Sequence, residues 1–447
     1  MTSSTRWWCA HAWLGGDGTE PGVILQVENG RFTEVRTAAT PPSDARILTG
    51  LVLPGLANAH SHAFHRALRG HVQRGRGDFW TWRDDAYAVA ARLDPDSYLA
   101  LARATFAEMA LAGITTVGEF HYLHHGPQGT AYADPHAFST ALVTAASEAG
   151  IRMTLLDTLY LTGGLGQPLA GVQHRFSDGS VDAWAQRTAM LVDGELVRHG
   201  LAVHSVRAVP VDALREAGVV ARERGCPMHA HVSEQPREND DCRDHHGCSP
   251  TALLHDAGIL GPEFTAVHAT HVGPADISLL AAAGAGACFC PTTERDLADG
   301  IGPATALAAA GVPLSLGSDS QAVVDLLEEM RGLELDERLA TGTRGNFAAA
   351  ALLRMATGHG MAALGWPADG LAVGAPADFI EVGLDSVRLA GATEASLLES
   401  VVFAGAATDV RTTVVAGRVI VEDGHHGDLD VPRELREAIA VARGERG

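Results

Sequence analysis

Two histidines at the end of an apolar run are the first residues in this sequence that suggest chemistry. His60 and His62 close the run LVLPGLANAHSH. Side chains alternate between the two faces of a β-strand, so both imidazoles point to the same side. Neutral imidazole is a common ligand of zinc, and two imidazoles on one face make up half of a four-ligand site. The pair therefore predicts half of a metal site.

Three further segments end short apolar runs on residues that bind metals. MHAHVSE carries His231, TAVHATH carries His268, and PLSLGSDS carries Asp319. The His-x-His spacing alone is a weak signal in a chain with 22 histidines, since His229 and His231 are also two apart. Strand ends that are distant in the chain meet most readily at the carboxyl-terminal rim of a closed parallel barrel. Together, the segments predict one divalent-metal site at such a rim.

Metal-assisted hydrolysis gives each candidate ligand a task. His60, His62 and His231 are predicted to hold zinc while leaving a position open for water. Zinc lowers the pKa of bound water from about 15.7 to about 7, which supplies hydroxide at neutral pH. Asp319 is predicted to ligate the metal and to accept the proton of the water, although an aspartate after a glycine is often only a helix cap. Iron or manganese fits the same ligands.

Two further residues complete the predicted catalytic set. Glu234 follows His231 by three residues, so a loop there can fold the carboxylate over the metal. Glu234 is then placed to carry a proton from the water to a leaving nitrogen, and His268 to hydrogen-bond the water. A single loop carboxylate is more often solvated surface, and only the joint pattern favours catalysis.

Arginine, histidine and tyrosine near other strand ends are candidates for substrate binding. HSVRAV places His204 and Arg207 after the fourth strand, DFWTWRDD carries Arg83, and GEFHYLHH carries Tyr122. His65 follows the histidine pair by three residues. A guanidinium that faces a pocket binds a carboxylate through two parallel hydrogen bonds. Packing roles, and a surface ion pair for Arg207, are equally consistent with the sequence.

Composition restricts the possible functions. A net charge of −21 over 447 residues argues against nucleic acid or an anionic membrane as the main partner. It does not exclude a small acidic substrate, because a local arginine pocket can oppose the overall field. The sequence contains no lysine, which excludes a metal bridge of carbamylated lysine and a Schiff-base lysine. The six cysteines form no CxxC pair and are expected to be reduced. With no signal peptide or membrane-length apolar run, a cytoplasmic location is expected.

Apolar strands that alternate with helical segments predict a (β/α)8 TIM-like barrel over residues 51–368, with a doubly wound open sheet as the alternative. Residues 1–50 and 369–447 carry short strands with Gly and Asn turns, and are expected to form one small β-sandwich domain with a terminal helix after Pro432. The barrel strands are expected at 51–57, 114–119, 152–158, 201–206, 226–231, 264–268, 286–290 and 313–318.

The motifs PGLANAHSH, HAHVSE, VHATH and LGSDS resemble those of the amidohydrolase superfamily, in its mononuclear-zinc deaminase branch. A narrower resemblance, to the formimidoylglutamate deiminase family, rests on FHRALRG, DFWTWR, GEFHYLHH, HSVRAV, HVSEQ and CPTTERDLADGIGP. That family uses zinc and water to convert N-formimino-L-glutamate to N-formyl-L-glutamate and ammonia in histidine degradation. The resemblance implies a homodimer, one zinc per chain on the four predicted ligands, and substrate contacts from His204, Arg207, Arg83 and Tyr122.

The chain departs from this family at one position. Where the family often has glutamine, three residues after the second metal histidine, this chain has His65. Two other functions stay open at this point. An aminohydrolase of the same branch acting on a purine or pyrimidine ring would need stacking and edge contacts. A metal-binding barrel without catalytic activity would be favoured by a missing ligand or a missing glutamate, and neither is missing.

Overall fold

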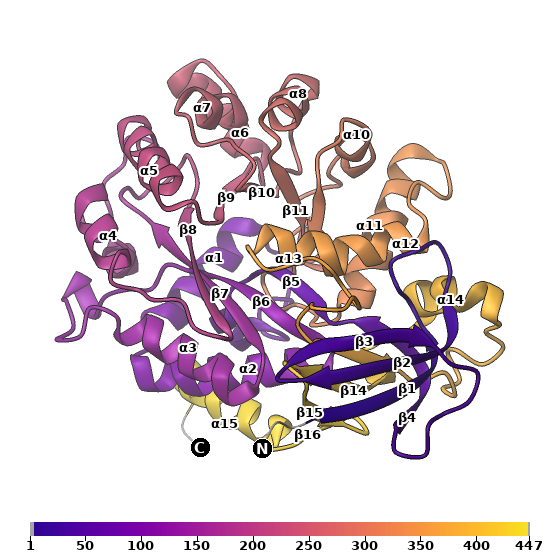
Figure 1. Cartoon of the computed structure of the whole chain (residues 1–447). Coiled ribbons are helices and arrows are strands. Elements are labelled where there is room, and N and C mark those ends of the chain that lie inside the picture. The colour runs from indigo at the N-terminus through magenta and orange to yellow at the C-terminus, as the bar shows by residue number, and fades with distance from the viewer. Residues whose placement is uncertain (1–3, 446–447) are drawn as a thin grey trace.

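The computed structural model describes residues 4–445 and contains two eight-stranded sheets. One sheet is a parallel, nearly closed barrel whose neighbouring strands follow chain order, which confirms the predicted barrel. Figure 1 shows the barrel strands surrounded by helices, with the indigo N-terminal strands lying beside the yellow C-terminal segments. The barrel strands are β5 (Leu56–Ser61), β6 (Ile114–His121), β7 (Arg152–Leu159), β8 (Val197–Val203), β9 (Met228–Val232), β10 (Phe264–His268), β11 (Gly286–Phe289) and β12 (Leu314–Leu316).

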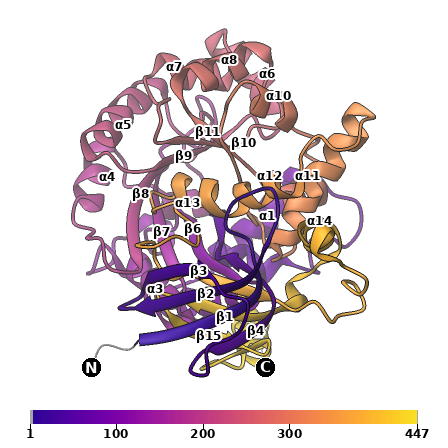
Figure 2. The same cartoon turned by 45° about the vertical axis from the view of Figure 1, so that its right-hand side comes forward.

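The second sheet is mixed and is built from both ends of the chain. Its strands are hydrogen-bonded in the order β16-β15-β14-β13-β4-β1-β2-β3, which confirms the expected small β-domain built from both chain ends. In the rotated view of Figure 2 this sheet lies at one side of the barrel. The strands are β1 (Ser4–Ala12), β2 (Glu20–Glu28), β3 (Arg31–Thr37), β4 (Arg46–Pro54), β13 (Phe379–Val382), β14 (Val410–Val415), β15 (Arg418–Glu422) and β16 (His425–His426).

The structure divides the apolar run in which the first barrel strand was expected. Residues 51–54 belong to β4, which pairs with β1 and β13 in the mixed sheet, and the barrel begins with β5. The chain crosses between the sheets at Gly55, where a Cβ atom would collide with the side chain of Thr115. When two consecutive strands are both buried, they form one continuous apolar run in the sequence. Such a run does not show by itself where the chain passes from one sheet to the other.

The barrel closes where its first and last strands meet. Ser61 forms a parallel bridge with Asp319. The Asn58 amide group donates to Ser318 Oγ at 2.6 Å, and its oxygen accepts the Ser318 amide at 2.9 Å. The amide of Asp319 donates to the carbonyl of His60 at 3.0 Å. The closing hydrogen bonds therefore fix the backbone of two predicted metal ligands.

Helices cover the outside of the barrel, and α15 packs on α2 as the predicted terminal helix. None of the helices within residues 4–445 combines the length and the apolar character needed to cross a bilayer. The helices are α1 (Phe79–Ala90), α2 (Pro95–Leu111), α3 (Ala137–Ala149), α4 (Val181–Thr188), α5 (Val211–Arg224), α6 (Pro236–His246), α7 (Pro250–Asp256), α8 (Pro274–Ala283), α9 (Pro291–Asp296), α10 (Ala304–Ala309), α11 (Leu326–Thr341), α12 (Ala349–Arg354), α13 (Gly360–Ala363), α14 (Leu397–Ala404) and α15 (Val431–Arg443).

Candidate metal centre and active site

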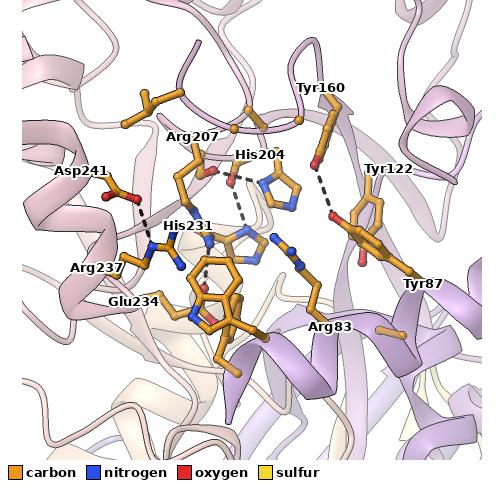
Figure 3. Close-up of a pocket in the computed structure, with 18 of the residues that line it drawn as sticks. Arg83, Tyr87, Tyr122, Tyr160, His204, Arg207, His231, Glu234, Arg237 and Asp241 are labelled. Carbon is orange, nitrogen blue, oxygen red and sulfur yellow. Dashed lines mark hydrogen bonds and ion pairs between the residues drawn. The ribbon is translucent and has the colours of Figure 1, made fainter. Parts of the chain in front are cut away.

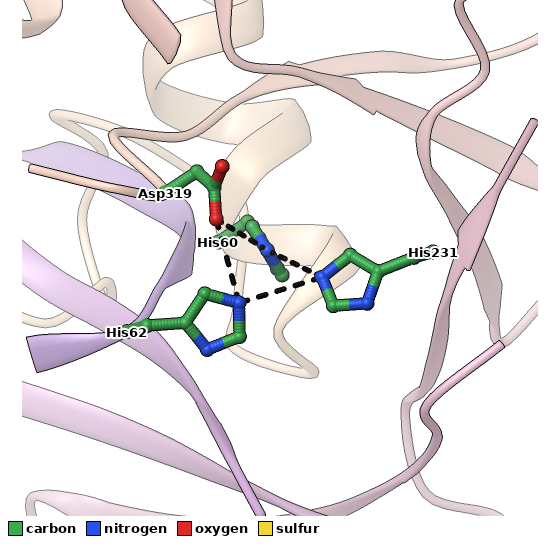
Figure 4. Close-up of side chains that lie close together, drawn as sticks. All are labelled: His60, His62, His231 and Asp319. Carbon is green, nitrogen blue, oxygen red and sulfur yellow. Dashed lines mark hydrogen bonds and ion pairs between the residues drawn. The ribbon is translucent and has the colours of Figure 1, made fainter. Parts of the chain in front are cut away.

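Four buried side chains meet at the carboxyl-terminal ends of β5, β9 and β12 (Figure 4). His231 Nε2 lies 3.2 Å from His60 Nε2 and 3.4 Å from His62 Nε2. Asp319 Oδ1 lies 3.3 Å from His60 Nε2 and 3.4 Å from His62 Nε2. A four-coordinate zinc with ligands at about 2.0–2.1 Å separates them by about 3.3 Å. The four donor atoms therefore have the spacing of a metal site.

Hydrogen bonds on the far side of the rings fix how the imidazoles face each other. His62 Nδ1 lies 2.9 Å from the carbonyl of Phe120, and His231 Nδ1 lies 3.0 Å from the carbonyl of His204. A carbonyl only accepts, so each Nδ1 carries the hydrogen and each Nε2 offers a lone pair. Burial lowers the pKa of His60 to about 3, which keeps that ring neutral too. Lone pairs and a carboxylate that face one another this closely fit a divalent cation between them.

The backbone at this rim lies in the left-handed region at several residues other than glycine. The φ angle is +53° at Ser233, +68° at His268 and +38° at Asp319. Side chains other than glycine adopt this region at a cost, and such residues cluster at functional sites. Ser233 stands between β9 and Glu234, so its turn decides where the Glu234 carboxylate points.

Glu234 and His268 lie beside the four candidate ligands. Glu234 Oε1 is 3.7 Å from His268 Nε2, which is 4.0 Å from Asp319 Oδ2. Burial raises the pKa of Glu234, so this carboxyl keeps a proton to higher pH than an exposed one. Burial opposes the charge of His268, but the carboxylates of Glu234, Glu294 and Asp319 outweigh it and raise its pKa well above the ordinary value. Glu294, which was not predicted from the sequence, lies 3.3 Å from His268 Nδ1.

A cavity of about 570 Å³ opens above these side chains (Figure 3). Its wall includes all five residues predicted to contact substrate: His65, Arg83, Tyr122, His204 and Arg207. His65 Nε2 lies 3.2 Å from the hydroxyl of Tyr122. The predicted site residues therefore all line one cavity except His60, which is completely buried beside His62 and His231.

The two arginines of the cavity differ in their surroundings. Arg207 Nη2 lies 3.3 Å from Glu234 Oε2, and Arg207 Nε lies 3.2 Å from Glu238 Oε2. Arg83 makes no ion pair within residues 4–445, and its guanidinium stacks on the rings of Trp80 at 4.7 Å and Tyr87 at 5.4 Å. Arg83 thus carries the charge with the least compensation from the protein.

An aromatic wall and one arginine at the rim of the cavity were not predicted from the sequence. The hydroxyls of Tyr87 and Tyr160 lie 3.4 Å apart, and the Gln173 amide donates to the Tyr160 hydroxyl at 3.1 Å. Arg237 on α6 stacks over the Trp80 ring at 5.0 Å. A helical spacing in the sequence could have revealed part of this wall, because α1 turns successive pairs of residues towards the cavity. These pairs are residues 79–80, 82–83 and 86–87.

A second buried cluster of metal-binding residue types lies outside the cavity and contains His121, His124 and Asp157. The Asp157 carboxylate accepts two hydrogen bonds from Arg187, at 2.7 and 2.8 Å. Arg187 also pairs with Asp178 at 2.8 Å. In this cluster the protein itself supplies a cation for the carboxylate.

Comparison with known proteins agrees with this geometry. The amidohydrolase family matches residues 51–420. The chain is 38% identical over 411 residues to the formimidoylglutamate deiminase of Pseudomonas aeruginosa, covering 89% of this chain and 90% of the relative. It is 32% identical to the 5-methylthioadenosine/S-adenosylhomocysteine deaminase of Natronomonas pharaonis, covering 93% and 92%. A crystal structure of an amidohydrolase from Brucella melitensis matches with a TM-score of 0.90 at 32% identity, covering 98% and 99%. This chain belongs to the amidohydrolase family and is a hydrolase of C–N bonds with a site for a divalent metal.

Proposed function

We propose that this enzyme uses zinc to hydrolyse N-formimino-L-glutamate to N-formyl-L-glutamate and ammonia, as a step of histidine degradation. The observation that carries the proposal is the pair of guanidiniums, Arg83 and Arg207, that line the same cavity as Glu234 and three of the four candidate metal ligands. A substrate with two carboxylates needs local cations in a chain with net charge −21. The identity to a formimidoylglutamate deiminase supports the same substrate.

The residues at the rim supply the groups that hydrolysis of a formimino carbon requires. His60, His62, His231 and Asp319 would hold zinc, which would lower the pKa of a bound water enough to provide hydroxide at neutral pH. Asp319 Oδ2 faces His268 and is free of arginine within residues 4–445, so it is placed to accept the proton that the water loses. The charged imidazole of His268 stabilises negative charge that develops on the oxygen added to the carbon.

Glu234 is the proton carrier in this proposal. Its carboxyl lines the cavity, and its raised pKa suits a group that must hold a proton and then release it. Glu234 protonates the formimino nitrogen as the oxygen of the water adds to the carbon. When the C–N bond breaks, the proton held by Asp319 passes to the same nitrogen and the hydroxyl proton returns to Glu234, so ammonia leaves and the carbon keeps the oxygen as a carbonyl. The product is the formamide of the same amino acid.

The cavity wall orients the glutamate part of the substrate. Arg83, whose charge has no carboxylate partner among the described residues, is placed to bind one carboxylate, and Arg207 to bind the other. Tyr122, His65 and His204 add hydrogen-bonding groups between the arginines and the metal ligands. A small acidic molecule is the class of substrate that this wall fits.

Hydrolysis of an amino group on a purine ring is the second candidate. The aromatic wall of Trp80, Tyr87 and Tyr160 offers stacking surfaces, and one relative is named for deamination of adenosine derivatives. The arginines favour the formimino substrate, because a purine presents no carboxylate.

Ammonia release from the zinc-loaded enzyme tests the proposal. The substrates are N-formimino-L-glutamate, N-formiminoglycine, 5-methylthioadenosine, guanine and cytosine. We expect the highest kcat/KM on N-formimino-L-glutamate. N-formiminoglycine lacks the side-chain carboxylate, and losing one charge-assisted contact of about 1.5–3 kcal/mol should lower kcat/KM about ten- to hundredfold. A higher kcat/KM on any of the ring compounds would contradict the proposal.

A further inference from the structure

One buried carboxylate beside the cavity has no task in the proposed chemistry. Glu238 lies in the first turn of α6 and is 1% exposed. Its two oxygens have different partners: Oε1 accepts the backbone N–H of Ser233 at 2.9 Å, and Oε2 lies 3.2 Å from Arg207 Nε. A carboxylate is costly to bury, so these two partners are what holds it there.

The partner of Oε1 is the turn that aims Glu234. Ser233 has a φ of +53° and is completely buried, and it directly precedes Glu234. A serine in the left-handed region keeps that conformation only where its surroundings hold it. The hydrogen bond to Glu238 fixes the position of the Ser233 amide. Glu238 therefore helps to set the direction in which the Glu234 side chain leaves the turn.

The partner of Oε2 is the arginine that borders both Glu234 and the cavity. Arg207 presents Nε to Glu238 and Nη2 to Glu234 Oε2, at 3.2 and 3.3 Å. Its Nη1 makes no hydrogen bond to a residue between positions 4 and 445. The Glu238 carboxylate pairs with the Nε side of the guanidinium and Glu234 with Nη2, so the two carboxylates hold the group in one orientation. In this orientation Nη1 is available to a ligand.

We propose that Glu238 is a positioning residue that holds the Arg207 guanidinium for the substrate carboxylate and the Ser233 turn for Glu234. One side chain thereby couples substrate binding to the placement of the proton carrier. The inference deepens the proposed function and rests on it for the identity of the substrate.

Two substitutions separate the two contacts of Glu238. In Glu238→Gln the amide oxygen still accepts the Ser233 N–H, but the amide nitrogen then faces Arg207 Nε, and two donors cannot pair. In Glu238→Ala both contacts are lost. Glu334→Gln is the matched control, because Glu334 is equally buried on α11 and does not line the cavity. It pairs with Arg338 at 2.7 Å and accepts the amides of Gly345 and Phe347.

Steady-state kinetics on N-formimino-L-glutamate with the full-length zinc-loaded enzymes provides the first test. For Glu238→Gln we expect KM to rise by about tenfold or more while kcat stays within about threefold. For Glu238→Ala we expect kcat to fall by a further factor of about ten, since the Ser233 turn relaxes. Glu334→Gln should leave both constants within about threefold of the wild type. Equal changes in Glu238→Gln and Glu334→Gln, or an unchanged KM in Glu238→Gln, would overturn the proposal.

A crystal structure of the zinc-loaded Glu238→Gln enzyme gives a readout that does not depend on the substrate. We expect the Arg207 guanidinium to leave residue 238 while the Ser233 N–H keeps its hydrogen bond. An Arg207 side chain in its wild-type position would overturn the positioning role. If the wild type fails to release ammonia from N-formimino-L-glutamate, the proposed function falls, and the position of Arg207 in this crystal still decides the role of Glu238.

Discussion

Two buried groups of histidine and aspartate lie near the ends of barrel strands, and they differ in what balances the carboxylate. Around Asp319, within residues 4–445, the carboxylate has imidazoles and no arginine as neighbours. Asp157, in the second cluster, accepts hydrogen bonds from both Nη1 and Nη2 along one edge of the Arg187 guanidinium. The same residue types therefore give a cation site in one region and an internal ion pair in the other, according to whether the protein provides its own cation.

The two regions also differ in access. His62, His231 and Asp319 line the cavity, whereas none of His121, His124 and Asp157 lines it. Closeness of histidines and carboxylates alone does not distinguish a metal site from an internal ion pair. The position of the nearest arginine and the presence of a cavity do.

The largest expected effect comes from neutralising the carboxylate of one cluster and then the other. Asp319→Asn should lose the metal and lower kcat by about a thousandfold or more, since metal assistance contributes several kcal/mol to hydrolysis. Asp157→Asn should keep one metal per chain and most of kcat, because Arg187 and not a metal is its partner. Metal analysis and ammonia release on the purified variants check both. Loss of metal from Asp157→Asn would contradict the distinction between a metal site at Asp319 and an internal ion pair at Asp157.

The second prediction separates holding a metal from moving a proton within the cavity region. Glu234→Gln keeps the size of the side chain but cannot carry a proton. We expect full metal content and a kcat lowered about a hundredfold or more, in the range typical of a lost general acid or base. Normal turnover by this variant would show that the proton travels by another route.

The third prediction concerns the arginine that distinguishes the clusters. Arg187→Met leaves two buried carboxylates, Asp157 and Asp178, without their cation, so the free energy of unfolding should fall by about 3–5 kcal/mol. Urea unfolding followed by tryptophan fluorescence measures the change. Arg215→Met, which removes an exposed pair with Asp212, should change it by about 0.5 kcal/mol or less. Equal effects of the two substitutions would deny Arg187 its structural role.

The smallest effect is a difference in acid sensitivity. Burial and the nearby Arg187 lower the pKa of His124 to about 4, while the unfolded chain titrates near 6.5. The unfolded state then binds the proton first, so stability falls by about 1.4 kcal/mol per unit as the pH drops from 6.5 to 4 and is unaffected above 6.5. The metal cluster is present in both proteins, so its contribution to the pH dependence cancels in their difference. The free energy of unfolding of His124→Gln minus that of the wild type, measured at each pH, therefore gives the pH dependence that is due to His124. Parallel stability curves for the two proteins over this range would contradict the assignment.

Most of the site residues that the sequence predicted lie at or just after strand ends, and Arg83 on α1 is the exception. His60, His62, His231, His268 and Asp319 follow apolar runs in chain order, and parallel strands of a barrel bring their carboxyl ends to one rim. The alternation of side chains along a strand and the order of the strands therefore sufficed to predict that these five residues lie together. The strand expected at 51–57 was misplaced because the run is apolar on both sides of Gly55, and only hydrogen-bond partners reveal the change of sheet.

The residues that sequence did not reveal reach the site from helices and loops. Tyr160 is the exception, because it directly follows β7, and Gln173 reaches its hydroxyl through the path that the chain takes after that strand. Glu238 and Arg237 reach the site because of the direction in which α6 leaves its turn. Glu294 reaches His268 from α9. The positions of these side chains depend on the way in which the long connections between strands fold back over the barrel. The local periodicity of the sequence does not encode that path.

The closure of the barrel at Ser61 and Asp319 has a consequence for the order of events during synthesis. The first two histidines of the metal site leave the ribosome early, but the aspartate that completes it follows only after more than half of the chain has been translated. A nascent chain therefore holds an incomplete donor set for most of its elongation. We expect the metal to be acquired late, when the last barrel strand arrives.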